Sequence, residues 1–274
     1  MRATLPLGLS LVTIESHRLR LIRWSVPVYP PMQLTYEFLA KRIDHSLLGP
    51  TLTDSDLEEG CRLAAAYNVA SVCIKPYAVS LAAQILKGTT VAVGTTVGFP
   101  HGANTTAVKV FEAECAMDDG ATELDMVVNI GQALGEDWTA IQQDIRAVVQ
   151  AAHARKALVK VIFENCYLSP AQISRLCKIC GEENADYVKT STGYGTGGAT
   201  PEDLKLMRDV TPAHVKLKAA GGIRTLDSAL AVAKLGCDRI GASKTAEMLD
   251  TLNVRLGLPT IGTGTVSRGT SETY

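Results

Sequence analysis

Short apolar runs alternate with longer helical patterns from Tyr36 onward, and this alternation limits the possible folds more than any other feature. Eight runs are rich in valine and isoleucine and are bounded by glycine, proline or threonine, which is typical of buried parallel strands. They cover residues 42–47, 71–75, 90–97, 123–129, 158–164, 186–190, 214–219 and 238–241. Eight strand-then-helix units predict an α/β fold, a closed (β/α)₈ TIM barrel. A doubly wound open sheet is the alternative, but the chain lacks GxGxxG after its first strand.

Three of the intervening segments begin with a residue that can cap a helix. Thr53, Ser169 and Thr200 are each followed, three positions later, by an acidic residue or a glutamine. Proline comes directly after Ser169 and Thr200, at the first helical position, where its missing N–H is harmless. These signals predict helices that start immediately after the caps.

The chain of 274 residues is long enough for one barrel-sized domain. The predicted barrel covers residues 35–255, and residues 256–274 are predicted to form a flexible C-terminal tail. Residues 1–34 contain four arginines and a single acidic residue, followed by a proline-rich stretch. We interpret this segment as an N-terminal extension of a single-domain protein; a weak organelle-targeting segment is the alternative.

Composition excludes several classes of partner. The net charge is -1 and the pI is about 6.5, which gives no basis for nucleic-acid binding or for binding to a membrane surface. No apolar run approaches the ~18 residues of a membrane span. Seven cysteines are scattered through apolar segments and are interpreted as reduced thiols, which predicts a cytoplasmic protein. The Cys177/Cys180 pair has no partner pair or nearby histidines, so no metal site is predicted.

Two lysines end two predicted buried strands. Lys189 follows Val188, and Lys218 follows Leu217, and in a (β/α)₈ barrel the C-terminal ends of the strands carry the active site. Burial and a second nearby ammonium group both lower the pKa of an amine, so either lysine is a candidate nucleophile toward a carbonyl. Salt-bridged structural lysines or phosphate contacts are the alternatives. Lys160 lies between two valines, and burying its charged side chain costs free energy unless it points into a polar barrel mouth.

Asp125 lies within the apolar run of residues 123–128, near the end of the predicted fourth strand. A carboxylate there can act as a general acid or base, or it can hold Lys189 or Lys218 as an ion-pair partner. The two roles are compatible, and the residues alone do not separate them.

Glycines after the seventh and eighth strands suggest a phosphate site. Gly221 and Gly222 follow the seventh strand, Gly241 ends the eighth and Ser243 follows it, and Gly193 lies after Lys189. In barrels of this type the loops after strands seven and eight commonly bind phosphate through backbone N–H groups. As ordinary loop glycines they would need no function.

Five ordered segments resemble the deoxyribose-phosphate aldolase family of class I aldolases. The resemblance runs from about residue 39 to residue 252, and the segments are 71–74, 97–102, 123–127, 189–193 and 218–225. It implies reversible cleavage of 2-deoxy-D-ribose 5-phosphate to D-glyceraldehyde 3-phosphate and acetaldehyde. It also implies that no cofactor or metal is used, because the iminium is itself the electron sink.

The resemblance also assigns roles to individual residues. It implies that Lys189 forms the Schiff base and that Lys218 and Asp125 handle protons. Tyr194 departs from the lysine or phenylalanine found at its position in the family. The C-terminal Tyr274 resembles a tail tyrosine that enters the site and donates a proton, although a tail without function is the alternative. Substrate-side or phosphate-side positions are implied for Cys73, Lys160, Thr192, Gly193, Gly221, Gly222, Gly241 and Ser243.

Two other functions stay open at this stage. A phosphate-binding barrel isomerase would abstract a proton with a carboxylate or histidine and would form no imine. A non-catalytic sugar-phosphate binder would use the phosphate loops alone. With the aldolase interpretation, the expected partners are small molecules, a sugar phosphate and acetaldehyde, and the expected assembly is a homodimer or homotetramer.

Overall fold

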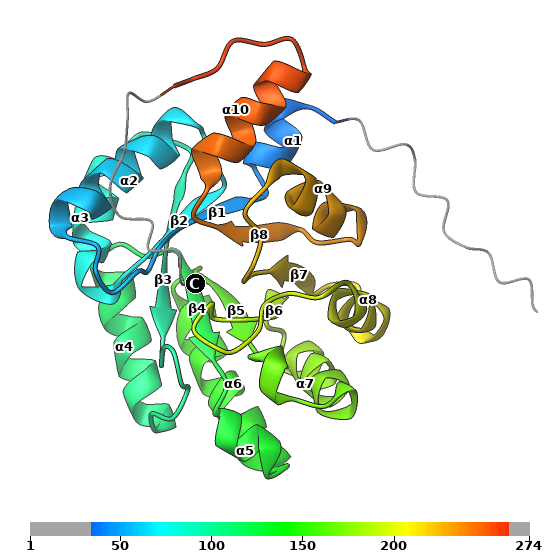
Figure 1. Cartoon of the computed structure of the whole chain (residues 1–274). Helices are drawn as coiled ribbons and strands as arrows, with labels where there is room; N and C mark the ends of the chain where they lie inside the picture. Colours follow the sequence, from blue (N-terminus) through cyan, green and yellow to red (C-terminus); the bar gives the residue numbers. More distant parts are fainter. Residues whose placement is uncertain (1–33, 263–274) are drawn as a thin grey trace, which may run out of the picture. The chain divides into compact units, whose positions relative to one another are not determined.

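Eight parallel strands form a closed barrel in the computed structural model, which describes residues 34–262 (Figure 1). The strands pair in chain order, and the last pairs with the first through Ile43 and Ile240. This confirms the predicted (β/α)₈ architecture. The strands are β1 Ile43–Leu47, β2 Ser71–Ile74, β3 Ala92–Val97, β4 Glu123–Val127, β5 Leu158–Ile162, β6 Tyr187–Lys189, β7 Lys216–Ala219 and β8 Arg239–Ala242.

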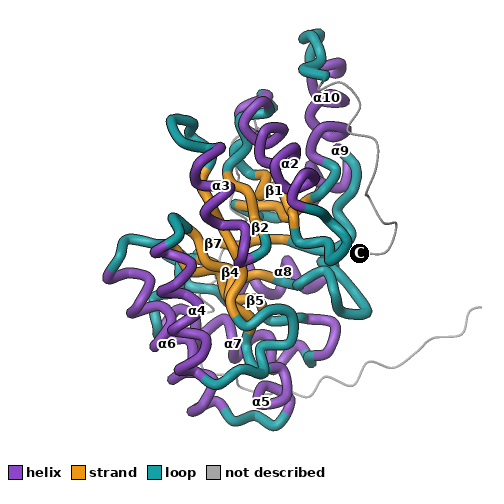
Figure 2. The backbone as a smooth tube through the Cα atoms, turned by 90° about the vertical axis from the view of Figure 1, so that its left-hand side faces the viewer, coloured by secondary structure: helices purple, strands orange, loops and turns teal. Residues whose placement is uncertain are grey.

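Helices lie outside the strands, as the purple and orange segments of Figure 2 show. The α-helices are α1 Tyr36–Ala40, α2 Asp54–Ala66, α3 Val79–Ile85, α4 Thr106–Asp118, α5 Ile130–Leu134, α6 Trp138–Ala154, α7 Pro170–Glu182, α8 Pro201–Val210, α9 Leu226–Lys234 and α10 Thr245–Arg255. Two 3₁₀ turns, η1 Pro76–Ala78 and η2 Asn165–Tyr167, follow β2 and β5.

The predicted helix caps are present. Thr53 accepts from the backbone N–H of Asp56, whose side chain accepts from the N–H of Thr53. Ser169 and Gln172 form the same reciprocal box at the start of α7. Thr200 accepts from the third residue of α8. These bonds satisfy N–H groups that have no partner within the helix.

The predicted strands end within two residues of the observed ones, and the shifted ends have local causes. Asn129, placed in the fourth strand, instead caps α5 by accepting from Gln132 N. Glu164, placed in the fifth strand, has a φ of 60°, which no strand residue adopts. Both residues therefore lie in loops at the C-terminal ends of the strands, outside the sheet.

Alternation along each strand produces two different environments. Leu124, Val159 and Leu217 are fully buried in the apolar core. Their neighbours Glu123 and Lys160 contact each other, and Lys160 also contacts a residue of β1, four strands away, which is possible only across the barrel interior. An apolar layer therefore surrounds the sheet while the interior of the barrel is charged.

The expected extension at residues 1–34 lies outside the described residues except for Leu34. The expected tail is described only as far as residue 262, and Tyr274 lies outside it. The three domain limits therefore stay predictions. Within residues 34–262, every helix is too short or too polar to cross a bilayer.

The β3–α4 loop supplies a test of the packing at the barrel mouth. Gly102 has a φ of 66°, and a Cβ there would lie 1.8 Å from the carbonyl oxygen of Val128. Gly88 also has a positive φ of 82°, but a Cβ there would meet nothing within 4 Å.

We expect Gly102→Ala to lower the free energy of unfolding by about 3 kcal/mol or more, because left-handed strain and overpacking add. The matched Gly88→Ala should cost only about 1–2 kcal/mol, for the strain alone. Urea unfolding of both variants measures the difference. Equal losses would contradict the clash at Gly102.

Candidate active site

Three lysines from consecutive strands converge on one carboxylate. Asp125 Oδ2 accepts from Lys189 Nζ and from Lys218 Nζ, both at 2.7 Å, and Oδ1 accepts from Lys160 Nζ at 2.9 Å. All four side chains are at most 4% exposed. The structure therefore brings together the predicted nucleophile, its two neighbouring amines and the predicted acid.

Strand register explains this convergence. Lys189 pairs directly with Lys218 across β6 and β7, and Asp125 pairs with Lys160 across β4 and β5. Paired residues in neighbouring strands point to the same face, so all four face the interior. Figure 1 shows these four strands side by side.

The network continues toward the N-terminal ends of the strands. Asp44 Oδ2 lies 2.5 Å from Lys218 Nζ and 3.1 Å from Lys160 Nζ, and Glu123 Oε2 lies 2.6 Å from Lys160 Nζ. Arg239 contacts Asp44 and places Nη2 2.8 Å from Glu123 Oε1. Four basic groups thus share three carboxylates.

The lysines differ in their protonation. The pKa of Lys189 is lowered, first by burial and further by the Lys218 ammonium, although Asp125 opposes the change. Burial also acts on Lys218 and Lys160, but the carboxylates Asp125 and Asp44 outweigh it and raise both pKa values. Lys189 is therefore the amine of the three that most readily exists as the neutral nucleophile.

The network also sets the protonation states of its carboxylates and of the nearby Cys73 thiol. Burial disfavours ionisation of Asp125 and Asp44, yet the ammonium groups of Lys160 and Lys218 hold the pKa of both carboxyls below the ordinary value. Cys73 Sγ lies 3.9 Å from Asp125 Oδ2, and burial raises the pKa of the thiol to about 11. Cys73 therefore contributes a neutral thiol beside the amines.

Thr192, three residues after Lys189, is held by Glu164 of the loop after β5. Its backbone N–H donates to Glu164 Oε1 at 3.1 Å, and its hydroxyl donates to Glu164 Oε2. Thr192 Oγ1 in turn accepts from Tyr194 N at 2.9 Å, and the Tyr194 hydroxyl donates to the carbonyl oxygen of Leu48 at 2.6 Å. The loop after β6 is thereby joined to the loops after β5 and β1.

The glycine loops are also joined to this loop. Thr190 Oγ1 donates to Ala220 O at 3.0 Å and accepts from Ala220 N at 3.1 Å. A Cβ on Gly221 would lie 2.7 Å from the Cα of Gly198, so these two backbones touch. The loops after β6 and β7 thus form one surface beside Lys189.

The other predicted phosphate positions differ in their surroundings. Gly193 and Gly222 have φ values of 92° and 82°, and a Cβ on either would meet nothing within 4 Å. Gly241 lies in β8, where a Cβ would be 3.6 Å from Lys218 Cε. Ser243 is exposed just before α10. Phosphate binding at these positions stays a prediction.

Lys160 is enclosed by carboxylates of the barrel interior. Its amine is fully buried and lies within 3.1 Å of an oxygen of each of Asp44, Glu123 and Asp125. A ligand would have to displace one of these carboxylates to reach it, so its predicted substrate contact stays untested.

The predicted site residues do not include three members of the network, Asp44, Glu123 and Arg239. Glu123 and Arg239 each lie two positions from a predicted site residue on the same strand face. Two histidines also lie near the strand ends. His45 is buried in β1 and its Nδ1 lies 2.8 Å from Thr245 Oγ1 of α10, outside the barrel interior. His101 is exposed in the β3–α4 loop.

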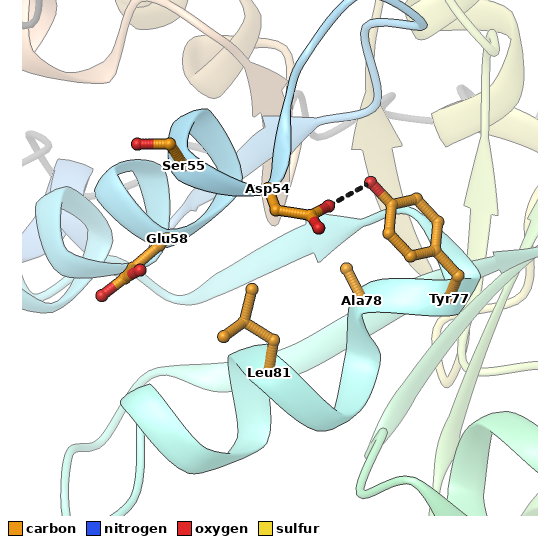
Figure 3. A pocket seen from close by; sticks show the side chains of 6 residues that line it. All are labelled: Asp54, Ser55, Glu58, Tyr77, Ala78 and Leu81. Atoms are coloured by element: carbon orange, nitrogen blue, oxygen red, sulfur yellow. Dashed lines mark hydrogen bonds between the residues drawn. The ribbon is translucent and has the colours of Figure 1, made fainter.

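A surface pocket of about 420 Å³ lies between the start of α2 and the η1–α3 segment (Figure 3). Asp54 and Glu58 line it, and Asp54 Oδ1 accepts from the Tyr77 hydroxyl at 2.9 Å. Two carboxylates repel an anion, so this pocket is unsuited to a phosphate ester. Within residues 34–262, His, Cys, Asp and Glu side chains form no group of three or more that is placed to hold a metal ion.

Comparisons with known proteins agree on one family. Residues 38–249 match the family model described as DeoC/LacD family aldolase. The deoxyribose-phosphate aldolase of Rhodopirellula baltica is 54% identical over 226 residues, covering 82% of this chain and 94% of the relative. That of Clostridium perfringens strain 13 is 50% identical over 205 residues, covering 75% and 91%. The tetrameric deoxyribose phosphate aldolase structure from Aeropyrum pernix superposes with a TM-score of 0.75 at 31% identity, covering 80% of this chain and 92% of that one.

The buried network should make Asp44 important for stability. We expect Asp44→Asn to lower the free energy of unfolding by about 3 kcal/mol or more, because buried cations lose their counter-charge. Asp118→Asn is the matched control: its partner is Arg155, and the Asp118 side chain is 70% exposed, so it should cost less than about 1 kcal/mol. Urea unfolding at pH 7 compares the two; similar losses would show that the interior charges are not coupled.

Proposed function

The chain belongs to the DeoC/LacD family of aldolases, and we propose that Lys189 is the amine through which it forms an imine with its substrate. The protein is a deoxyribose-phosphate aldolase, a carbon–carbon lyase that reversibly cleaves 2-deoxy-D-ribose 5-phosphate to D-glyceraldehyde 3-phosphate and acetaldehyde. The observation that carries the proposal is a contrast in contacts: Lys189 contacts one carboxylate, Lys218 two and Lys160 three. In line with these contacts, only the pKa of Lys189 is lowered among the three.

In the proposed first step, neutral Lys189 Nζ attacks the aldehyde carbon C1 of the open-chain sugar. A carbinolamine forms and loses its hydroxyl as water, which leaves an iminium between Nζ and C1. The departing oxygen needs a proton, and Lys218 can supply one, because its ammonium shares Asp125 Oδ2 with Lys189.

Cleavage then breaks the bond between C2 and C3. A base takes the proton from the C3 hydroxyl, C3 becomes the aldehyde of glyceraldehyde 3-phosphate, and the bonding electrons move onto the iminium to give an enamine. Protonation of the enamine at C2 and addition of water at C1 release acetaldehyde and regenerate the amine. We assign the proton transfers to Asp125 and Lys218, with Tyr274 as the proposed proton donor to C2.

The phosphate is proposed to bind the loops after β6, β7 and β8. Gly193 and Gly222 have open space where a side chain would be, and Gly221 packs against Gly198 so closely that a side chain would not fit. Gly221 and Gly222 both have positive φ values, and turns of this kind can form backbone nests in which successive N–H groups bind an anion. Gly241 and Ser243 complete the proposed site from β8, and Thr192 and Cys73 are proposed to contact the rest of the sugar.

The remaining assignments concern the cell and the assembly. We propose a cytoplasmic enzyme of deoxyribose phosphate catabolism, supported by seven cysteines that are all free thiols. A homodimer or homotetramer is the proposed assembly, in line with the tetrameric Aeropyrum pernix relative. Residues 1–34 are proposed to be an extension of the barrel domain.

Trapping the imine tests the nucleophile. Incubation with acetaldehyde and borohydride should add an ethyl group at Lys189, located by peptide mass mapping. Lys189→Met should lose the adduct and reduce kcat for deoxyribose 5-phosphate cleavage by at least about a thousandfold.

Lys216→Met is the matched control, since Lys216 lies on the neighbouring strand but is exposed. It should keep both the adduct and turnover. Turnover by the wild type without an adduct would point to an isomerase-like mechanism, and binding without turnover would indicate a sugar-phosphate binder. An adduct at Lys218 would move the nucleophile to that residue.

A further inference from the structure

We propose that the Arg239–Glu123 ion pair sets the protonation state of Lys189 from the opposite end of the barrel interior, making both side chains positioning residues for the amine. Arg239 and Glu123 are the first residues of β8 and β4, whereas Lys189 is the last residue of β6. The inference rests on the proposed role of Lys189 as nucleophile.

Two routes of ion pairs connect the two ends. One runs from Arg239 through Asp44 and Lys218 to Asp125, which bonds Lys189. The other runs from Glu123 through Lys160 to the same Asp125. Each link is a direct contact between buried or largely buried charged atoms, where the effective dielectric constant is low and Coulomb interactions persist over distance.

The number of carboxylate partners decides which basic group gives up a proton. Lys160 contacts three carboxylates, Lys218 two and Arg239 two, but Lys189 contacts only Asp125. Arginine stays protonated in proteins. With four basic groups and three carboxylates in one buried network, deprotonation of Lys189 leaves the network neutral and removes the least stabilised charge.

Other groups also face Lys189. Asp125 approaches from β4, Lys218 from β7 and Cys73 from β2, and Glu164 acts on it from the end of β5. Each of these side chains is proposed to take part in the reaction or to contact the substrate, except Glu164, which holds the loop after β6 through Thr192. Arg239 and Glu123 contact neither Lys189 nor Asp125 in the described contacts, so changing them alters charge at a distance.

The proposal predicts shifts of opposite sign from the same broken ion pair. Arg239→Gln removes a positive charge, so the Lys189 ammonium is better stabilised and its pKa should rise. Glu123→Gln removes a negative charge, so that pKa should fall further. A purely structural role for the pair predicts the same direction of change in both variants.

Competitive acetylation with acetic anhydride across pH, followed by peptide mass mapping, measures the apparent pKa of Lys189 without requiring turnover. A unit charge about 10 Å from an amine, at an effective dielectric constant near 20, shifts its pKa by about one unit. We expect a rise of about one pH unit for Arg239→Gln and an equal fall for Glu123→Gln. In each variant, the acidic limb of the pH profile of kcat/KM should shift in the same direction as the pKa of Lys189.

Two further variants control for structure. The double variant Arg239→Gln/Glu123→Gln restores the charge balance and should return the pKa to within a few tenths of the wild-type value, although the ion pair is missing. Arg239→Lys keeps the charge but not the two-pronged geometry and should also stay near wild type. If Arg239→Gln fails to fold, Glu123→Gln and Arg239→Lys decide the question.

Shifts in one direction for both single variants, or no shift in a folded Glu123→Gln protein, would overturn the proposal. A wild-type protein that gives no borohydride adduct with acetaldehyde would instead overturn the nucleophile assignment. The two failures are distinguishable, because acetylation reports the protonation of Lys189 whether or not it forms an imine.

Discussion

One carboxylate shared by three amines organises the interior of this barrel. Asp125 uses both oxygens, at 2.7 Å to Lys189 and Lys218 and at 2.9 Å to Lys160. A buried charge without a partner costs several kcal/mol, and Lys189 has no carboxylate partner other than Asp125, whereas Lys160 and Lys218 also contact Asp44. The ammonium groups ensure that Asp125 is ionised, because they hold its pKa well below the ordinary value.

The surrounding fold keeps this arrangement in place. Apolar residues such as Leu124 and Leu217 alternate with the charged ones and pack against the helices, which fixes each strand's register. A slip of one residue in β7 would exchange Lys218 for Leu217 in the interior, leaving Asp125 short of a partner and a lysine in the apolar layer. The burial pattern outside the barrel thus specifies the chemistry inside it.

Much of this arrangement could be predicted from local patterns, and the rest could not for a physical reason. The runs ending in Lys189 and Lys218 identified both lysines as strand-end residues, and the motifs around them gave the expectation that Lys189 is the nucleophile. Arg239 was missed because its partners lie on β4 and β1, and nothing near residue 239 specifies contacts across a closed barrel. Asn129 and Glu164 were placed in strands because their apolar neighbours continue the strand pattern, while capping and a positive φ are decided by the loops.

The distinction between Lys189 and Lys218 comes from their position along the barrel axis. Lys218 lies where Asp44 reaches it from β1 as well as Asp125 from β4, so its ammonium has two counter-charges. Lys189, paired with it across the strands, ends β6 beyond the reach of Asp44 and has one. The same burial therefore leaves one amine protonated, able to donate, and lets its neighbour become neutral, able to attack. A proton donor and a nucleophile arise from two identical side chains because the carboxylates are distributed unevenly between the ends of the barrel.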